Sequence, residues 1–520
     1  MTTLFRRLSF ALLALLGLAA PARAEWYEAS SDHFVIYADD KDADIRRFSE
    51  NLERYHSALT FLLGRELDLP SPSSRVVIYV VGGEKEMRSL SGSRTVGGFY
   101  IPRAGGSRAF VQDIRNKRGY PDFSTVILLH EYAHHVLMSS SRFAMPRWEN
   151  EGAAEFFASA SFNDDGSLLI GRPALHRAGD ILYADPVHVR ELLDPALYEQ
   201  KKVKGYDGFY AKSWLLYHYL MFSKTRKGQL VEYELALAKG MGQKEAGEAA
   251  FGDLDKLERE LRGYLTDTMY SVPLSPDKLR TGTITLRKLT PGEAAIMPLQ
   301  IRSQRGVGKE EAAQIVAEAR TIAARFPEDP GVLTALAEAE FDAGNDAAAI
   351  AAADGAIARD PARTNAYVQK GFALFRQAAK AENRAAAYAA AVKPFVALNR
   401  LENDHPLPLI YFYRAQVERG LKPNENARAA LERAAVLAPF DHGLQINAGM
   451  MLIQEGSHTI ARAFLAPVAA NPHGGRPAQA AKQLMALIDG VADGTEVDMG
   501  KLREAGEDKE QAPDAAAAAQ

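Results

Sequence analysis

The chain has 520 residues, of which 47% are hydrophobic and 25% are charged, and its formal net charge is −4. This length exceeds one ordinary hydrophobic core and predicts two or three domains. Without a large basic surplus, the composition favours neither nucleic acid nor an anionic membrane surface as a partner. The absence of cysteine excludes disulfides, thiol catalysis and thiolate metal ligands.

The first 24 residues differ from the rest of the chain. An arginine pair precedes the apolar run 8–20, and Ala22-Arg23-Ala24 follows it. This pattern is typical of a cleaved signal peptide, so we expect the mature chain to begin near Glu25. An uncleaved anchor is the alternative, but the run is shorter than the roughly 20 residues that cross a bilayer. We therefore expect an exported protein, periplasmic or secreted, with no stable membrane insertion after cleavage.

Residues 25–270 mix strand and helix patterns. Residues 34–38 and 75–81 are rich in β-branched and aromatic side chains and predict strands, and a helix with apolar spacing lies between them. Residues 99–101 and 108–113 predict a hairpin around a glycine turn. From residue 123 the pattern is helical, including residues 125–138 and 148–160. We expect an α+β domain whose strands gather in one sheet.

Residues 271–306 contain four prolines and one short alternating run, and predict a connector. Beyond it, Pro327, Pro361, Pro406, Pro439 and Pro472 recur at intervals of 34, 45, 33 and 33 residues. Three of these intervals match a helix-turn-helix repeat.

Small residues occupy matching positions before two of these prolines. They are Ala337, Gly344, Ala349 and Ala356 in one unit, and Ala415, Ala427 and Ala434 in another. Residues 307–490 therefore resemble tetratricopeptide repeats, which implies a surface for a protein partner. An unrelated alanine-rich helical array is the alternative, because the signature aromatic residues are mostly missing. The acidic tail, residues 491–520, is expected to be disordered.

The segment His130-Glu131-Tyr132-Ala133-His134 is an H-E-x-x-H motif within an apolar helical pattern. Residues i and i+4 of a helix differ by about 40° around its axis and about 6 Å along it, so both imidazoles can reach one metal ion. A solvated helix that carries two histidines is the alternative. Glu131 lies beside the same face and can contact a metal-bound water.

A second block follows at residues 147–155, with the sequence RWENEGAAE. Two histidines and a glutamate are a standard ligand set for a catalytic zinc ion, which keeps one position open. A turn between two packed helices would bring Glu151 to the same ion as His130 and His134.

The two blocks together resemble the gluzincin metallopeptidases, and the wider chain resembles bacterial peptidase-MA-like proteins. The resemblance implies an α+β zincin-like metallopeptidase domain followed by an all-α helical repeat domain. It also implies one Zn²⁺ ion, Glu151 as the third ligand and Glu131 as the general base. Glu155, one helical turn after Glu151, is implied to orient a ligand histidine; an exposed helix charge is the alternative.

The segment 209–214 (FYAKSW) partly resembles the tyrosine-containing block of the zinc aminopeptidases. That resemblance implies that Tyr210 stabilises the oxyanion, although Ala211 and Ser213 depart from the pattern. Tyr210 could instead be a core aromatic of a helix.

The expected function is hydrolysis of peptide bonds in a peptide or protein substrate by a zinc-activated water. The strand at residues 108–113 is the expected edge for substrate addition. Two alternatives stay open. One is a repeat interaction protein with a structural or inactive zinc site, and the other is a zinc hydrolase of a non-peptide amide.

Overall fold

The computed structural model describes residues 25–65, 67–94, 96–114, 121–140, 144–201, 203, 205–471 and 473–498. The predicted signal peptide and residues 499–520 of the predicted tail lie outside the described residues. None of the helices in the described part of the chain is long and apolar enough to cross a membrane.

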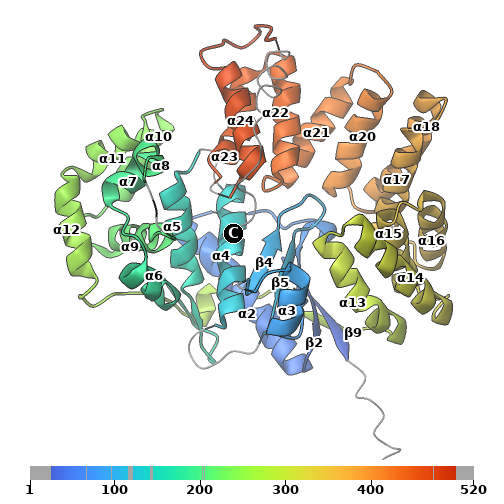
Figure 1. Ribbon diagram of the computed structural model, residues 1–520, viewed down its shortest axis with the longest axis horizontal. Helices are drawn as coiled ribbons and strands as arrows, with labels where there is room; N and C mark the ends of the chain where they lie inside the picture. The colour runs from blue at the N-terminus through green and yellow to red at the C-terminus, as the bar shows by residue number, and fades with distance from the viewer. Residues whose placement is uncertain are drawn as a thin grey trace, which may run out of the picture.

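A six-stranded mixed sheet lies at the centre of the molecule (Figure 1). Its order is β4 (Gly98–Ile101), β5 (Arg108–Val111), β3 (Val76–Val80), β2 (Phe34–Asp39), β1 (Trp26–Ser30) and β9 (Thr285–Lys288). The strands β2, β3 and β5 are parallel, whereas β4, β1 and β9 each run antiparallel to their neighbours. The predicted hairpin and the gathering of the predicted strands in one sheet are confirmed.

Helices cover both faces of this sheet. Successive strand residues point to opposite faces. Ile78 packs in the core with α2 (Asp42–Leu63) and α4 (Phe123–Ser140). Its neighbour Tyr79 packs on the other face, in the cluster that contains residues of α3 (Glu84–Ser91) and α13 (Pro291–Arg305). The sheet thus holds α4 on one side and the start of the C-terminal helices on the other.

A helical layer packs beside α4. Its central members are α5 (Arg147–Ala158) and α9 (Phe209–Phe222), which pack against each other. The surrounding elements are η2 (Leu175–Arg177), α6 (Ala178–Tyr183), α7 (Val189–Leu193), α8 (Pro195–Glu199), α10 (Gln229–Ala238), α11 (Gln243–Phe251) and α12 (Leu254–Tyr264). A small antiparallel sheet joins β6 (Ser161–Phe162), β7 (Leu168–Ile170) and β8 (Val272–Leu274).

The C-terminal region consists of tetratricopeptide-like helical repeats. The helices are α14 (Lys309–Arg325), α15 (Pro330–Asp342), α16 (Asp346–Arg359), α17 (Thr364–Ala378), α18 (Arg384–Ala391), α19 (Lys393–Leu401), α20 (Pro406–Glu418), α21 (Glu425–Leu437), α22 (His442–Gln454), α23 (His458–Ala469) and α24 (Gly475–Leu487). Six of the seven predicted small residues are buried where neighbouring helices approach; Ala349 and Ala427, for example, are fully buried. The seventh, Gly344, is exposed in the turn after α15, where its φ of 84° suits glycine. The 45-residue unit departs from the pattern because α18 and α19 replace one helix.

Three local predictions differ from the structure. Residues 271–306, predicted as a connector, contain β8, β9 and α13, and β9 pairs with β1, so the central sheet extends past residue 270. The prediction that residues 108–113 form a free edge of the sheet is wrong, because β5 pairs with both β3 and β4. The terminal strand is β4. The tail also begins ordered, since Gly494 donates to the Gly456 carbonyl at 2.8 Å and Thr495 contacts His458.

The repeats curve back so that α22 to α24 lie next to α4 and the β4–β5 loop (Figure 1). The backbone N–H of Ala104 donates to Asp441 at 2.8 Å. The ring of His135, on α4, lies 4.2 Å from the ring of Phe440. The C-terminal repeats and the N-terminal α+β region therefore share an interface beside α4, the helix of the H-E-x-x-H motif.

Candidate metal site

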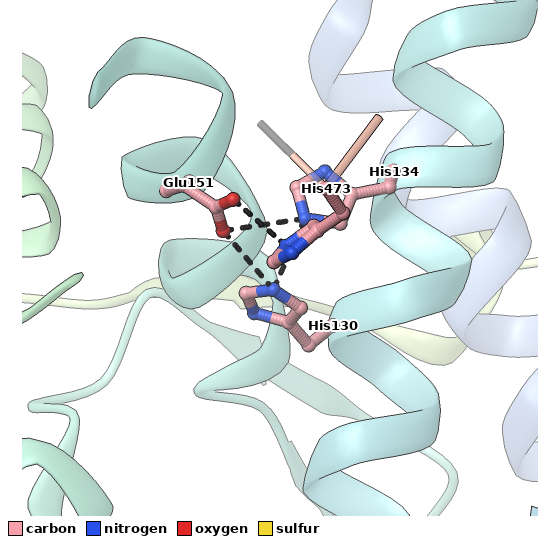
Figure 2. Close-up of side chains that lie close together, drawn as sticks. All are labelled: His130, His134, Glu151 and His473. Carbon is pink, nitrogen blue, oxygen red and sulfur yellow. Dashed lines mark hydrogen bonds and ion pairs between the residues drawn. The ribbon is translucent and has the colours of Figure 1, made fainter. Parts of the chain in front are cut away.

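The helix α4 presents His130 and His134 on one face, toward α5 (Figure 2). Their Nε2 atoms lie 3.0 Å apart. Leu129 and Ala133, between and beside them, are fully buried in the core. Packing of these side chains in the core fixes the position of α4, and the i and i+4 spacing brings both imidazoles to one point.

The other ring nitrogen of each histidine faces an oxygen. His134 Nδ1 donates to Asn150 Oδ1 at 2.9 Å. His130 Nδ1 lies 3.2 Å from Glu155 Oε1. Because these oxygens accept, the proton of each neutral imidazole lies on Nδ1 and the Nε2 lone pair is left to bind a metal.

The carboxylate of Glu151, on α5, faces the two imidazoles. Its Oε2 lies 3.3 Å from His130 Nε2 and 3.4 Å from His134 Nε2. The side chain is fully buried. Among the described residues, no hydrogen-bond partner meets either Glu151 oxygen with acceptable geometry. A buried carboxylate needs a compensating charge or hydrogen bonds.

Gly152 determines how closely α5 approaches α9. A Cβ atom at this position would lie 2.5 Å from the Ser213 carbonyl oxygen, which is closer than real Cβ atoms approach backbone. The glycine therefore lets the two helices touch, and their contact places Glu151 and Tyr210 near the same imidazoles.

The donor set fits a zinc ion. Two neutral imidazole nitrogens and a carboxylate are ligands that zinc accepts, and neither oxygen of the buried carboxylate makes a hydrogen bond of acceptable geometry with the described residues. In the structure, a fourth group joins them: the ligand atoms of His130, His134, Glu151 and His473 all lie within 4.8 Å of one another.

His473 comes from the loop between α23 and α24, in the last repeat (Figure 2). Its Nε2 lies 2.9 Å from Glu151 Oε1. Sequence reasoning missed this residue, because nothing in the local sequence of a repeat loop indicates that it approaches a motif more than three hundred residues earlier.

Glu131 lines a cavity of about 300 Å³ between α4 and the repeats. Tyr100 of β4 and Phe440 of the repeats line the same cavity, together with His134. The Tyr100 hydroxyl contacts His135 Nδ1 at 2.9 Å. His135 thus faces β4 and the repeats and is not a member of the candidate donor group of His130, His134, Glu151 and His473.

Glu155 is held by two basic groups. Arg177 donates to Glu155 Oε1 from Nε at 2.9 Å and from Nη2 at 2.6 Å. His176 Nε2 lies 2.5 Å from Glu155 Oε2. The carboxylate is 1% exposed, so the alternative of an exposed helix charge does not describe it. His176 and Arg177 therefore fix the carboxylate that faces His130.

Tyr210 is the second residue of α9 and lies beside the site. Its ring centroid is 6.4 Å from that of His130 and 6.2 Å from that of His473. The guanidinium of Arg177 lies over the Tyr210 ring, 4.8 Å from its centroid. The side chain is half-buried, so it is available to a ligand in the site as well as being packed.

Burial and neighbouring charges shift the pKa values of three residues at the site. Burial lowers the pKa of His130, but the charge of Glu155 and the contacts with Glu151 outweigh it and raise that pKa to about 10. Burial raises the pKa of Glu151, yet the charge of His134 and its contacts with the imidazoles hold the pKa well below its usual range. Without metal, the site therefore keeps a proton on His130 beside an ionised carboxylate. Burial and the Glu151 charge raise the pKa of Tyr210, so its hydroxyl stays protonated.

No protein-family model matches the chain, and no curated protein matches it. Among solved structures, the chain is similar to a thermophilic TPR protein of Thermus thermophilus, with 16% identity, a TM-score of 0.32, and coverage of 38% of this chain and 100% of the other. It is also similar to the MamA RS-1 ArsTM double mutant, with 15% identity, a TM-score of 0.27, and coverage of 39% and 98%. At these TM-scores the similarity does not define a shared function.

Proposed function

We propose that this chain is an exported zinc-dependent peptidase. One observation carries the proposal: the buried Glu151 carboxylate has no hydrogen-bond partner of acceptable geometry among the described residues and faces two imidazole Nε2 atoms. The oxygens of Asn150 and Glu155 face the Nδ1 atoms of those imidazoles. This is the arrangement that a catalytic zinc ion requires, with three ligands and oriented imidazoles. The N-terminal signal pattern supports export.

His130, His134 and Glu151 would hold the zinc ion. When bound, zinc polarises a carbonyl and makes water a better nucleophile. Glu131 follows His130 directly and lines the cavity. In the proposed reaction, Glu131 accepts a proton from the attacking water and returns it to the leaving amine. The protonated Tyr210 hydroxyl donates to the oxygen that gains charge in the transition state.

The proposed substrate is an extended peptide. The strand β4 terminates the central sheet and packs against α4, and its Tyr100 lines the cavity that contains Glu131. An extended chain can add to a terminal strand through main-chain hydrogen bonds. This edge replaces the one predicted at residues 108–113.

A second candidate function is that of an interaction protein with a structural zinc site. The tetratricopeptide-like repeats favour a protein partner. The approach of His473 to the three ligands also supports this reading, because four protein ligands are typical of structural zinc. Hydrolysis of a non-peptide amide is the third candidate, since the same chemistry acts on that bond.

Purified mature protein should be assayed for zinc content and for hydrolysis of casein and of peptidoglycan fragments. We expect one zinc per chain and cleavage of casein. Glu131→Gln should keep zinc and lose hydrolysis by roughly 10²- to 10⁴-fold, because the general base is removed. Cleavage of peptidoglycan fragments alone would favour the amide hydrolase, and undiminished activity of Glu131→Gln would exclude Glu131 as the base.

A further inference from the structure

The repeats supply a fourth side chain to the proposed zinc site. We propose that His473 is a metal ligand that closes the site, so that the structure represents a latent form of the enzyme. This inference rests on the proposed peptidase function. A catalytic zinc ion has three protein ligands and one open position, whereas a site with four protein ligands leaves no position for substrate.

The geometry of Glu151 supports this assignment. Its Oε2 lies next to the Nε2 atoms of His130 and His134, and its Oε1 lies 2.9 Å from His473 Nε2. All four ligand atoms lie within 4.8 Å of one another, so one ion can reach every donor after small side-chain shifts. The imidazole of His473 therefore lies on the same side of Glu151 as the histidine pair.

His473 also lies next to the residue that is proposed to bind the substrate carbonyl. Its ring is nearly parallel to that of Tyr210, at an interplanar angle of 18° and a centroid distance of 6.2 Å. The ring of His473 lies 5.7 Å from that of His134. In this position the imidazole occupies space that a substrate would need between Tyr210 and the ligands.

A short anchor places the loop that carries His473. Asn471 Oδ1 accepts the backbone N–H of His473 at 2.8 Å. The Asn471 amide nitrogen lies 2.9 Å from His442 Nε2, in α22, and 3.7 Å from Met138 Sδ, in α4. The loop is thus attached both to the repeats and to the helix of the H-E-x-x-H motif.

The side chain of His473 can leave without unfolding the core. It is 46% exposed, whereas Glu151 is 0% exposed. Opening the site therefore requires movement of a loop at the domain interface, and the three buried ligands can stay in place. A repeat surface that binds another protein could favour the open form, because a partner shifts the equilibrium toward the form that it binds better.

The test compares full-length wild type with His473→Ala after replacement of zinc by Co²⁺. The visible spectrum of Co²⁺ reports its ligands. We expect a different spectrum in the variant, and we expect acetohydroxamate, a small metal-binding probe, to change the spectrum of His473→Ala much more than that of wild type. His188→Ala is the control, since His188 is an exposed histidine on the surface before α7. The Co²⁺ spectrum of His188→Ala, and its response to acetohydroxamate, should match those of wild type.

Casein hydrolysis is the second readout. If the open form is a minor population of about 0.1–10%, His473→Ala should hydrolyse casein at least about 10-fold faster than wild type. Identical Co²⁺ spectra in wild type and variant would overturn the assignment of His473 as a ligand. A changed spectrum with equal, measurable activities would overturn latency. A changed spectrum with no hydrolysis by either protein would support the fourth ligand and would instead overturn the proposed peptidase function.

Discussion

The side chain of Asn150 accepts a hydrogen bond from His134 Nδ1 at 2.9 Å, one residue before the buried carboxylate of Glu151. The helix α5 therefore supplies both a proposed metal donor and the group that orients another proposed donor. Glu155, one turn later, faces His130 in the same way. A single helix thus holds both imidazoles in the tautomer that a metal needs.

The two glutamates of α5 should differ in their effects on zinc. Glu151→Ala removes a charged donor and should abolish stable zinc binding. Glu155→Ala leaves the donors in place and should weaken affinity by about 10- to 100-fold, the usual effect of a group that orients a ligand. Zinc titration of both variants measures this difference. Tight binding by Glu151→Ala together with loss of zinc from Glu155→Ala would reverse the assignment.

Tyr210→Phe tests whether the hydroxyl takes part in catalysis. The variant keeps the ring that packs near His130 and loses the donor, so kcat should fall by about 10²- to 10³-fold, as for loss of one oxyanion donor. Zinc content should not change, because Tyr210 is not a member of the donor group. Tyr206→Phe, at an exposed tyrosine nearby in sequence, is the matched control. Equal kcat values for the two variants would assign Tyr210 to packing alone.

Gly152→Ala tests the contact between α5 and α9. The added Cβ would meet the Ser213 carbonyl oxygen at 2.5 Å, so the two helices must separate. We expect a loss of about 1–3 kcal/mol in the free energy of unfolding, typical of overpacking, together with weaker zinc binding. Gly179→Ala is the control, because nothing lies within 4 Å of a Cβ atom built there. Denaturant unfolding of both variants gives the comparison, and equal stabilities would contradict a close contact.

Zinc binding should release protons. The metal-free pKa of His130 is raised to about 10, so this imidazole holds a proton at neutral pH and zinc must displace it. Apparent zinc affinity should therefore rise with pH, by about tenfold per unit below that pKa, and level off above it. Calorimetric titration near neutral pH in buffers of different ionisation enthalpy should show release of about one proton or more. A binding enthalpy that does not vary with the buffer would contradict this expectation.

Local features of the site could be predicted from the sequence. The spacing of His130 and His134 depends only on helix geometry, and the block around Glu151 belongs to the next helix along the chain. Tyr210 is brought to the same place by α9. These residues lie within about eighty positions of one another, on helices with clear apolar patterns.

Features that depend on distant contacts could not be predicted. Strand order is set by packing of the whole sheet, so the sequence of residues 108–111 does not reveal that β5 is paired on both sides. The strand β9 has four residues and an alternating pattern that also suits a linker. The position of His473 depends on the curvature accumulated over all the repeats, which the sequence of one loop does not contain.

The pairing of β1 with β9 also determines when the central sheet can be completed. Tyr27 pairs with Lys288, so one edge of β1 has no strand partner until residues 285–288 have been synthesised. Contacts between residues so distant in sequence form slowly, and an unpaired strand edge can pair with other chains. The nascent chain therefore passes through a period in which three of the four proposed metal ligands have been synthesised while the edge of β1 is still open to aggregation.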